Sequence, residues 1–82
     1  MKFRATFRRG DRTVPVAGSV GQRARDWHGA FAFATDDEPA INPGPAELLT
    51  DDGKTWEILV SSCRVSSSGR GQCDFRVLKG LP

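Results

Sequence analysis

The chain has 82 residues, 38% hydrophobic and 27% charged, with a net charge of +2 at neutral pH. This length predicts one small domain spanning residues 1–82, and the apolar content is too high for a disordered chain. No apolar run approaches the ~20 residues of a membrane helix, and the basic first residues lack the apolar core of a signal peptide, so we expect a cytoplasmic protein without a membrane segment.

The first residues predict a hairpin. Apolar and mostly basic side chains alternate over residues 1–8, which is typical of a half-exposed strand with a basic outer face. After a turn, Thr13–Val16 is expected to be an edge strand or a strand end, because Pro15 has no N–H to donate to a ladder. Residues 17–23 contain two glycines and are expected to form a loop, in which Val20 docks on the core.

The next segment, residues 24–34, has a mixed signal. Its alanines favour a helix. However, a glycine interrupts the segment, and phenylalanine alternates with alanine over residues 31–34. We therefore predict a strand from about Gly29 to Thr35, with Trp27 packed at its entrance.

An acidic turn and a crossover then separate the two halves of the chain. The carboxylates of residues 36–38 lack the spaced oxygen ligands of a calcium loop, so no metal site is predicted there. Residues 40–45 are too rich in proline and glycine for regular structure. Within this crossover, Ile41 is expected to enter the core.

The Asp-Gly step at residues 52–53 is the strongest local signal and predicts a hairpin turn. Two registers compete. A two-residue loop places Leu49 opposite Trp56, whereas a three-residue loop places Leu48 there. The three-residue loop collects apolar side chains on one face, so we predict it. It also sets two like charges opposite each other at a mild cost, namely Glu47 and Glu57.

The strand after this turn is expected to run from Thr55 to Val65. Its apolar residues change parity, because Trp56 begins one alternating set while Cys63 and Val65 have the opposite parity. A β-bulge at Ser61–Ser62 would shift the phase and turn both sets toward one core. The alternative is a strand that is buried on both faces for part of its length.

The last part of the chain completes a C-terminal meander. A polar, glycine-rich hairpin loop is expected at residues 66–72, and apolar residues at period two predict a strand over residues 73–77. Short strands with frequent glycine and proline turns indicate an all-β fold. We predict a small barrel of about five to six antiparallel strands, SH3-like or OB-like, with little or no helix.

The two cysteines, Cys63 and Cys73, have the same parity in the predicted hairpin and should share a face. In a cytoplasmic protein we expect them to be reduced and buried, with a cross-strand disulfide as the alternative. A metal centre is not expected. The single histidine, His28, raises the ligand count to only three, and there is no short Cys-x-x-Cys spacing.

Charge is segregated along the chain. Residues 1–25 carry seven basic and one acidic side chain, residues 26–57 one basic and eight acidic, and residues 58–82 four basic and one acidic. If the terminal strands are neighbours, the basic ends form one face that could bind nucleic acid or another anionic ligand. Otherwise these side chains are a solvated surface or pair with the acidic middle of the chain. The candidate binding residues are Lys2, Arg4, Arg8, Arg64 and Arg76.

Two short motifs are explained without a function. The Arg-Gly-Asp tripeptide at residues 9–11 lies in a turn, where glycine and aspartate are expected. Arg8 and Arg12 resemble the RxxxR segment of PilZ domains, small barrels that bind a cyclic dinucleotide, and Ser66–Gly69 resembles part of their second segment. However, Arg64 stands where that segment requires an acid or amide, and we do not assign the chain to this family.

No catalytic set is evident. Asp26 could orient His28, but no nucleophile accompanies them, so we predict no enzyme and no cofactor. The hypothesis from sequence is a non-enzymatic interaction module that works by protein–protein contact or self-association. Its expected contact surfaces are the strand edge at Thr13–Val16 and the loop at residues 66–72. The alternative is binding of nucleic acid or another anionic ligand through the basic face.

Overall fold

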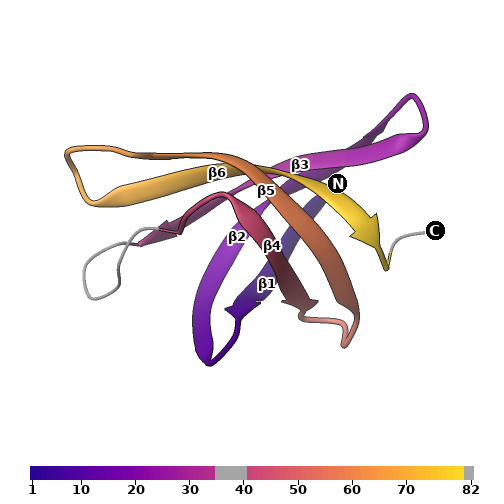
Figure 1. Ribbon diagram of the computed structural model, residues 1–82, viewed down its shortest axis with the longest axis horizontal. Helices are drawn as coiled ribbons and strands as arrows, with labels where there is room; N and C mark the ends of the chain where they lie inside the picture. Colours follow the sequence, from indigo (N-terminus) through magenta and orange to yellow (C-terminus); the bar gives the residue numbers. More distant parts are fainter. Residues whose placement is uncertain (35–40, 81–82) are drawn as a thin grey trace.

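The computed structural model describes residues 1–34 and 41–80, and in this part of the chain every regular element is a strand. The six antiparallel strands close into a barrel, as Figure 1 shows, which confirms the predicted all-β barrel. No helix that could cross a membrane occurs in the described part. The strands are β1 (Lys2–Arg9), β2 (Arg12–Arg23), β3 (Asp26–Ala34), β4 (Gly44–Thr50), β5 (Thr55–Val65) and β6 (Arg70–Lys79).

The barrel consists of two three-stranded meanders joined along two seams. Its strand order is β1-β2-β3-β6-β5-β4, and the ring closes where β4 pairs with β1. The second seam joins β3 to β6. The expectation that the two terminal strands are neighbours is therefore wrong. β1 is the outer strand of the first meander and pairs with β4. β6 is the outer strand of the second meander and pairs with β3.

Strand β2 is longer than predicted. Thr13–Val16 pairs with β1 and has no pair on the β3 side among the described residues, so the edge expected around Pro15 is confirmed. The loop expected at residues 17–23 is wrong, since β2 continues to Arg23 and pairs there with β3. Its glycines mark a close approach of strands rather than a loop. A Cβ atom at Gly18 would lie 1.9 Å from the carbonyl oxygen of Ala30 in β3.

The β4–β5 hairpin has the predicted three-residue loop. Leu48 pairs with Trp56, and Glu47 lies opposite Glu57. The Gly53 N–H donates to the Thr50 carbonyl (3.0 Å), and Gly53 adopts a φ of 87°, which glycine accepts without a Cβ clash. The Thr50 hydroxyl donates to the Asp52 carboxylate, and this bond lowers the pKa of Asp52 below its ordinary value.

The predicted bulge in β5 is also present. The pairing of β5 with β6 shifts between Val60 and Ser62, and this turns Cys63 toward the core. The same expectation for Val65 is wrong, because this side chain is 50% exposed. The β4–β5 pairing ends at Val60, so the rest of β5 leaves the barrel with β6 and projects as a hairpin (Figure 1).

The core fills the barrel with aromatic and β-branched side chains. Val20 and Ile41 are buried, as predicted. Trp27 packs on the core near the start of β3, which begins at Asp26, three residues earlier than predicted. The acidic turn expected at residues 36–39 lies outside the described residues. The buried set comprises Ala5, Phe7, Val14, Val16, Val20, Phe31, Phe33, Ile41, Leu48, Trp56, Ile58, Val60, Cys73 and Phe75.

The β2–β3 turn contains a strained residue. Ala24 has a φ of 57°, in the left-handed region, where a Cβ atom crowds the backbone. We expect Ala24→Gly to stabilise the fold by roughly 0.5–1 kcal/mol, because glycine relieves this strain and costs less there than in a regular strand. Urea denaturation measures the change. A decrease in stability would show that the unfolded-state entropy of glycine outweighs the strain.

Candidate functional site

One row of outward side chains crosses five strands of the barrel. In the pairing registers, Arg4 of β1 lies opposite Ala17 of β2, and Ala17 lies opposite Ala32 of β3. Ala32 in turn faces Gln72 of β6, which faces Arg64 of β5. The row therefore places basic side chains at its two ends, with two alanines and a glutamine between them.

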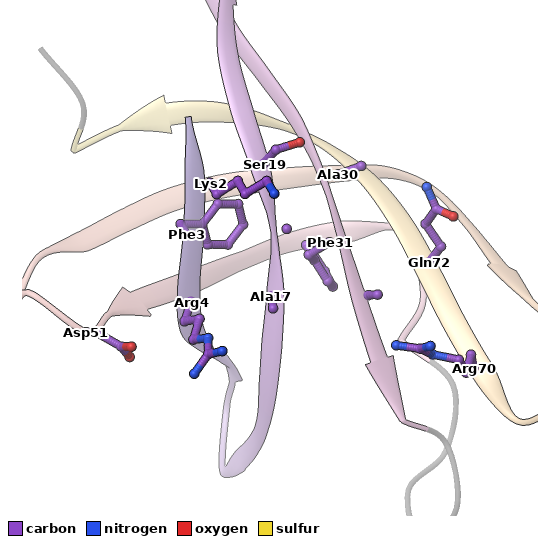
Figure 2. Close-up of a pocket in the computed structure, with 12 residues that line it drawn as sticks. Lys2, Phe3, Arg4, Ala17, Ser19, Ala30, Phe31, Asp51, Arg70 and Gln72 are labelled. Atoms are coloured by element: carbon purple, nitrogen blue, oxygen red, sulfur yellow. The ribbon is translucent and has the colours of Figure 1, made fainter.

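The middle of this row is the floor of a depression of about 720 Å³, which we call the trough. Figure 2 shows it between two rims, with Lys2 and Arg4 on the β1 side and Arg70 and Gln72 on the β6 side. Neighbouring strands lie about 4.8 Å apart, so the backbones of the rims are separated by three steps, or roughly 14 Å along the sheet. The floor is lined by small residues, namely Ala17, Gly18, Ser19, Ala30 and Ala32.

The trough continues along β2 and β3 beyond this floor. A second depression shares the Arg4 and Arg70 side chains and extends over Pro15 and Ala34, where β2 and β3 are no longer paired. An elongated hollow thus follows the strand direction, with cations on both sides. Its shape suits a narrow, extended ligand better than a round one.

The cations of the trough are available for binding. The side chains of Lys2, Arg4 and Arg70 are exposed, and within residues 1–34 and 41–80 they make no ion pair or side-chain hydrogen bond. Among the lining residues that the structure describes, Asp51 is the one carboxylate, and its backbone N–H donates to the Arg4 carbonyl at 3.2 Å. The described lining residues thus contribute three cations and one carboxylate, an excess of positive charge.

The structure brings together three of the five candidate residues from the sequence. Lys2 and Arg4 form one rim, and Arg64 lies at the far end of the row, in a depression that it shares with Arg70. Arg8 and Arg76 lie elsewhere. Arg8 pairs with an acidic residue of β4, and Arg76 lies opposite His28 and Leu59 on another part of the outer face.

The sequence predicts Arg70 and Gln72 as part of a contact loop at residues 66–72, but it does not predict the small-residue floor. The structure instead places both residues in β6, which begins at Arg70. Alanine alternates with phenylalanine over residues 30–34, and this pattern indicates that the alanines point outward. The strand order, which places these alanines beside Ala17, could not be predicted from this pattern.

The ion pair of Arg8 with Glu47 spans the β1–β4 seam. The guanidinium donates twice to one carboxylate oxygen, from Nε at 3.1 Å and from Nη2 at 2.8 Å. Both side chains are about 40% exposed (41% and 39%), so water screens the interaction. In a double-mutant cycle with Arg8→Ala and Glu47→Ala, we expect a coupling free energy below about 1 kcal/mol from urea denaturation. A larger value would identify this pair as a main determinant of the seam.

Cys63 and Cys73 lie directly opposite each other on β5 and β6, with both thiols free and their Sγ atoms 2.6 Å apart. Their expected common face is confirmed. Cys73 is buried and Cys63 is partly exposed. Burial raises the pKa of the Cys73 thiol well above its ordinary value, and the contact with Cys63 adds to the effect.

This raised pKa predicts a loss of stability in alkali. Above the ordinary thiol pKa of about 8.5, the unfolded chain releases a proton that the folded chain keeps on Cys73. The free energy of unfolding should therefore fall above about pH 9, by up to about 1.4 kcal/mol per pH unit, until the folded pKa is reached. Urea denaturation of the wild type and of Cys73→Ala measures the difference in slope. Equal slopes would contradict the assignment to Cys73.

Two other features singled out in the sequence remain, the Arg-Gly-Asp turn and His28. The turn has a structural explanation, and His28 is not part of a metal-ligating cluster within the described residues. The Arg9 guanidinium, in the Arg-Gly-Asp turn, donates to the carbonyls of Pro45 and Gly44 and lies over the Phe7 ring. His28 is exposed, and no group of three or more metal-ligating side chains occurs in the part of the chain that the structure describes. Comparisons with protein-family models, curated proteins and solved structures found no match.

Proposed function

We propose that this barrel is a non-enzymatic interaction module that binds an extended acidic segment of a partner protein in the trough. One observation supports the proposal above the others. Within the described residues, the cations on both rims are unpaired, Lys2 and Arg4 on one side and Arg70 on the other, and the floor between them has no side chain larger than serine apart from the buried Phe31. The site thus has positively charged side chains at its edges and small side chains in its middle.

An extended acidic peptide matches this layout. Its side chains alternate between two sides, so carboxylates on each side can reach one rim while the backbone lies on the floor. Arginine suits this role because its planar guanidinium binds a carboxylate with two parallel hydrogen bonds. The small floor residues, such as Ala17 and Ala32, let a peptide approach closely without displacing a side chain.

Single-stranded nucleic acid is less well matched, because such sites usually stack bases on exposed aromatic rings. The aromatic residues that line the trough are Phe3 and Phe31. Phe31 is buried, and the half-buried Phe3 ring packs edge-on against Trp56 and Phe75 at centroid distances of 5.2 and 5.9 Å. Neither offers a free face, so phosphate contacts alone would have to provide the affinity.

Fluorescence anisotropy tests the proposal with two labelled probes at low salt, an oligoglutamate peptide, which carries carboxylates on both sides when extended, and an oligothymidylate. We expect the peptide to bind more tightly, and Arg4→Glu and Arg70→Glu each to weaken it by at least about tenfold, equivalent to 1.4 kcal/mol. Arg76→Glu is the matched control, because it changes the net charge equally outside the trough. It should have a much smaller effect.

Three results would count against the proposal. If Arg76→Glu weakens binding as much as Arg70→Glu, the protein responds to net charge and not to the trough. If the oligothymidylate binds more tightly than the peptide, the partner is a nucleic acid. If neither probe binds at low salt, where charge interactions are strongest, the trough is not an anion site.

A further inference from the structure

We propose that Cys63 and Cys73 form a reversible redox site, at which the folded barrel reacts with a small-molecule disulfide and closes a cross-strand disulfide. The pair is defined by its position, since the two residues are register partners on adjacent antiparallel strands. Their sulfur atoms already touch at 2.6 Å, and both thiols are free. This chemistry needs no bound partner, so it is independent of the function proposed for the trough.

The strand geometry allows the bond without backbone rearrangement. Directly opposite residues in antiparallel strands have Cα atoms roughly 4.5–5.5 Å apart, whichever of the two pair types they form. A disulfide requires a Cα separation of about 4.4–6.8 Å. Cys63 and Cys73 also point to the same side, toward the end of the core. The bond would therefore form within the native register.

The two thiols are unequally accessible, and this sets the order of the reaction. Cys63 is partly exposed, in the part of β5 that extends beyond its pairing with β4. Cys73 is only 1% exposed and lies opposite Phe31 of β3 on its other side. A small disulfide can reach Cys63 but not Cys73. Cys63 is therefore the attacking residue, and Cys73 is the resolving one.

The exchange balances in two steps. The Cys63 thiolate attacks one sulfur of the small disulfide, forms a mixed disulfide and releases the first small thiolate. The Cys73 thiol then gives up its proton to solvent, and its thiolate attacks the Cys63 sulfur and displaces the second small thiolate. The protein loses two electrons and two protons, and the small disulfide is reduced to two thiols. Because burial keeps Cys73 protonated, the second step should be the slower one and should accelerate with pH.

The bond would close a short ring at the base of the projecting β5–β6 hairpin. This ring contains Arg64, Arg70 and Gln72, which line the trough or the depression beside it. Cross-linking a loop of this size restricts the unfolded chain and raises its stability. For a domain of this length, we expect oxidation to raise the Tm by roughly 10 °C or more.

The test equilibrates the native protein with a series of reduced and oxidised glutathione ratios. We expect a mass loss of two hydrogen atoms and the loss of both titratable thiols in oxidising buffer, with a higher Tm and an unchanged circular dichroism spectrum. Reductant should reverse each change. Two titratable thiols in the most oxidising native buffer would overturn the proposal. So would a disulfide that forms only after urea is added, or one that abolishes the fold.

Two variants examine the order of attack. Cys73→Ala should accumulate a stable glutathione adduct on Cys63, because the resolving thiol is absent. Cys63→Ala, which changes the more exposed member of the pair, should remain folded and acquire no adduct, because Cys73 is buried. An adduct on Cys73 in folded Cys63→Ala would contradict the assigned roles even if Cys73→Ala did not fold.

Discussion

Gly18→Ala should strongly destabilise the barrel. The added Cβ atom would lie 1.9 Å from the Ala30 carbonyl oxygen and 2.7 Å from the Phe31 Cα, and both are backbone atoms of β3. Backbone atoms cannot move aside as a flexible side-chain end can, so β2 and β3 would have to separate where they are paired. We expect a loss of at least about 4 kcal/mol, at the extreme of single substitutions. For a domain of this size, whose total stability is about 4–12 kcal/mol, this removes at least a third and up to all of it.

Gly21→Ala is the matched control for this prediction. It makes the same change on the same strand three residues away, and a Cβ atom there would meet nothing within 4 Å. Its stability should stay within about 0.5 kcal/mol of the wild type. Circular dichroism and urea denaturation compare the two proteins. A folded Gly18→Ala with near-wild-type stability would mean that β2 and β3 are not held as closely as the structure shows.

Phe31→Ala is expected to cost about 3–5 kcal/mol. Phe31 is 1% exposed, and its ring lies 5.7–6.2 Å from three other rings, those of Phe7, Phe33 and Phe75. These rings come from β1, β3 and β6, which belong to both meanders. Truncation leaves a cavity that several stiff aromatic side chains cannot collapse to fill, so the cost should lie well above that of a peripheral residue.

Leu78→Ala supplies the comparison, because this large apolar side chain is 53% exposed. Its truncation should cost less than about 1 kcal/mol, since little apolar area returns to water. Chemical denaturation with tryptophan fluorescence measures both variants. If Phe31→Ala cost no more than Leu78→Ala, Phe31 would not be the centre of the core.

Much of the second half of the fold could be predicted from its local chemistry. The Asp-Gly step at residues 52–53 and the positions of the apolar residues specified one register, and the parity change before Cys63 located the bulge. These features depend on neighbours in the sequence. The extent of β2 could not be predicted in the same way, because a glycine in a loop and a glycine at a close strand crossing look alike. Gly18 is of the second kind.

Only the basic residues of the candidate site could be predicted from the sequence. Outward parity identified Lys2 and Arg4, and Arg64 followed from its basic character near the C-terminal end. Whether these residues share a surface depends on the seams between strands that are far apart in sequence, which pattern alone does not give. The ion pair that occupies Arg8 is such a seam contact, because Glu47 lies 39 residues away. Long-range pairing thus decided which candidate cations have an acidic partner among the residues that the structure describes.

The two seams also bear on how copies of this chain can associate. Pairing of β1 with β4 and of β3 with β6 joins one meander to the other, and nothing in these registers requires both meanders to belong to the same molecule. Two chains could therefore exchange their C-terminal meanders and rebuild two barrels with the same core and the same hairpins. We expect such domain-swapped dimers to form on refolding at high protein concentration and to separate only by unfolding, which size-exclusion chromatography with light scattering would measure.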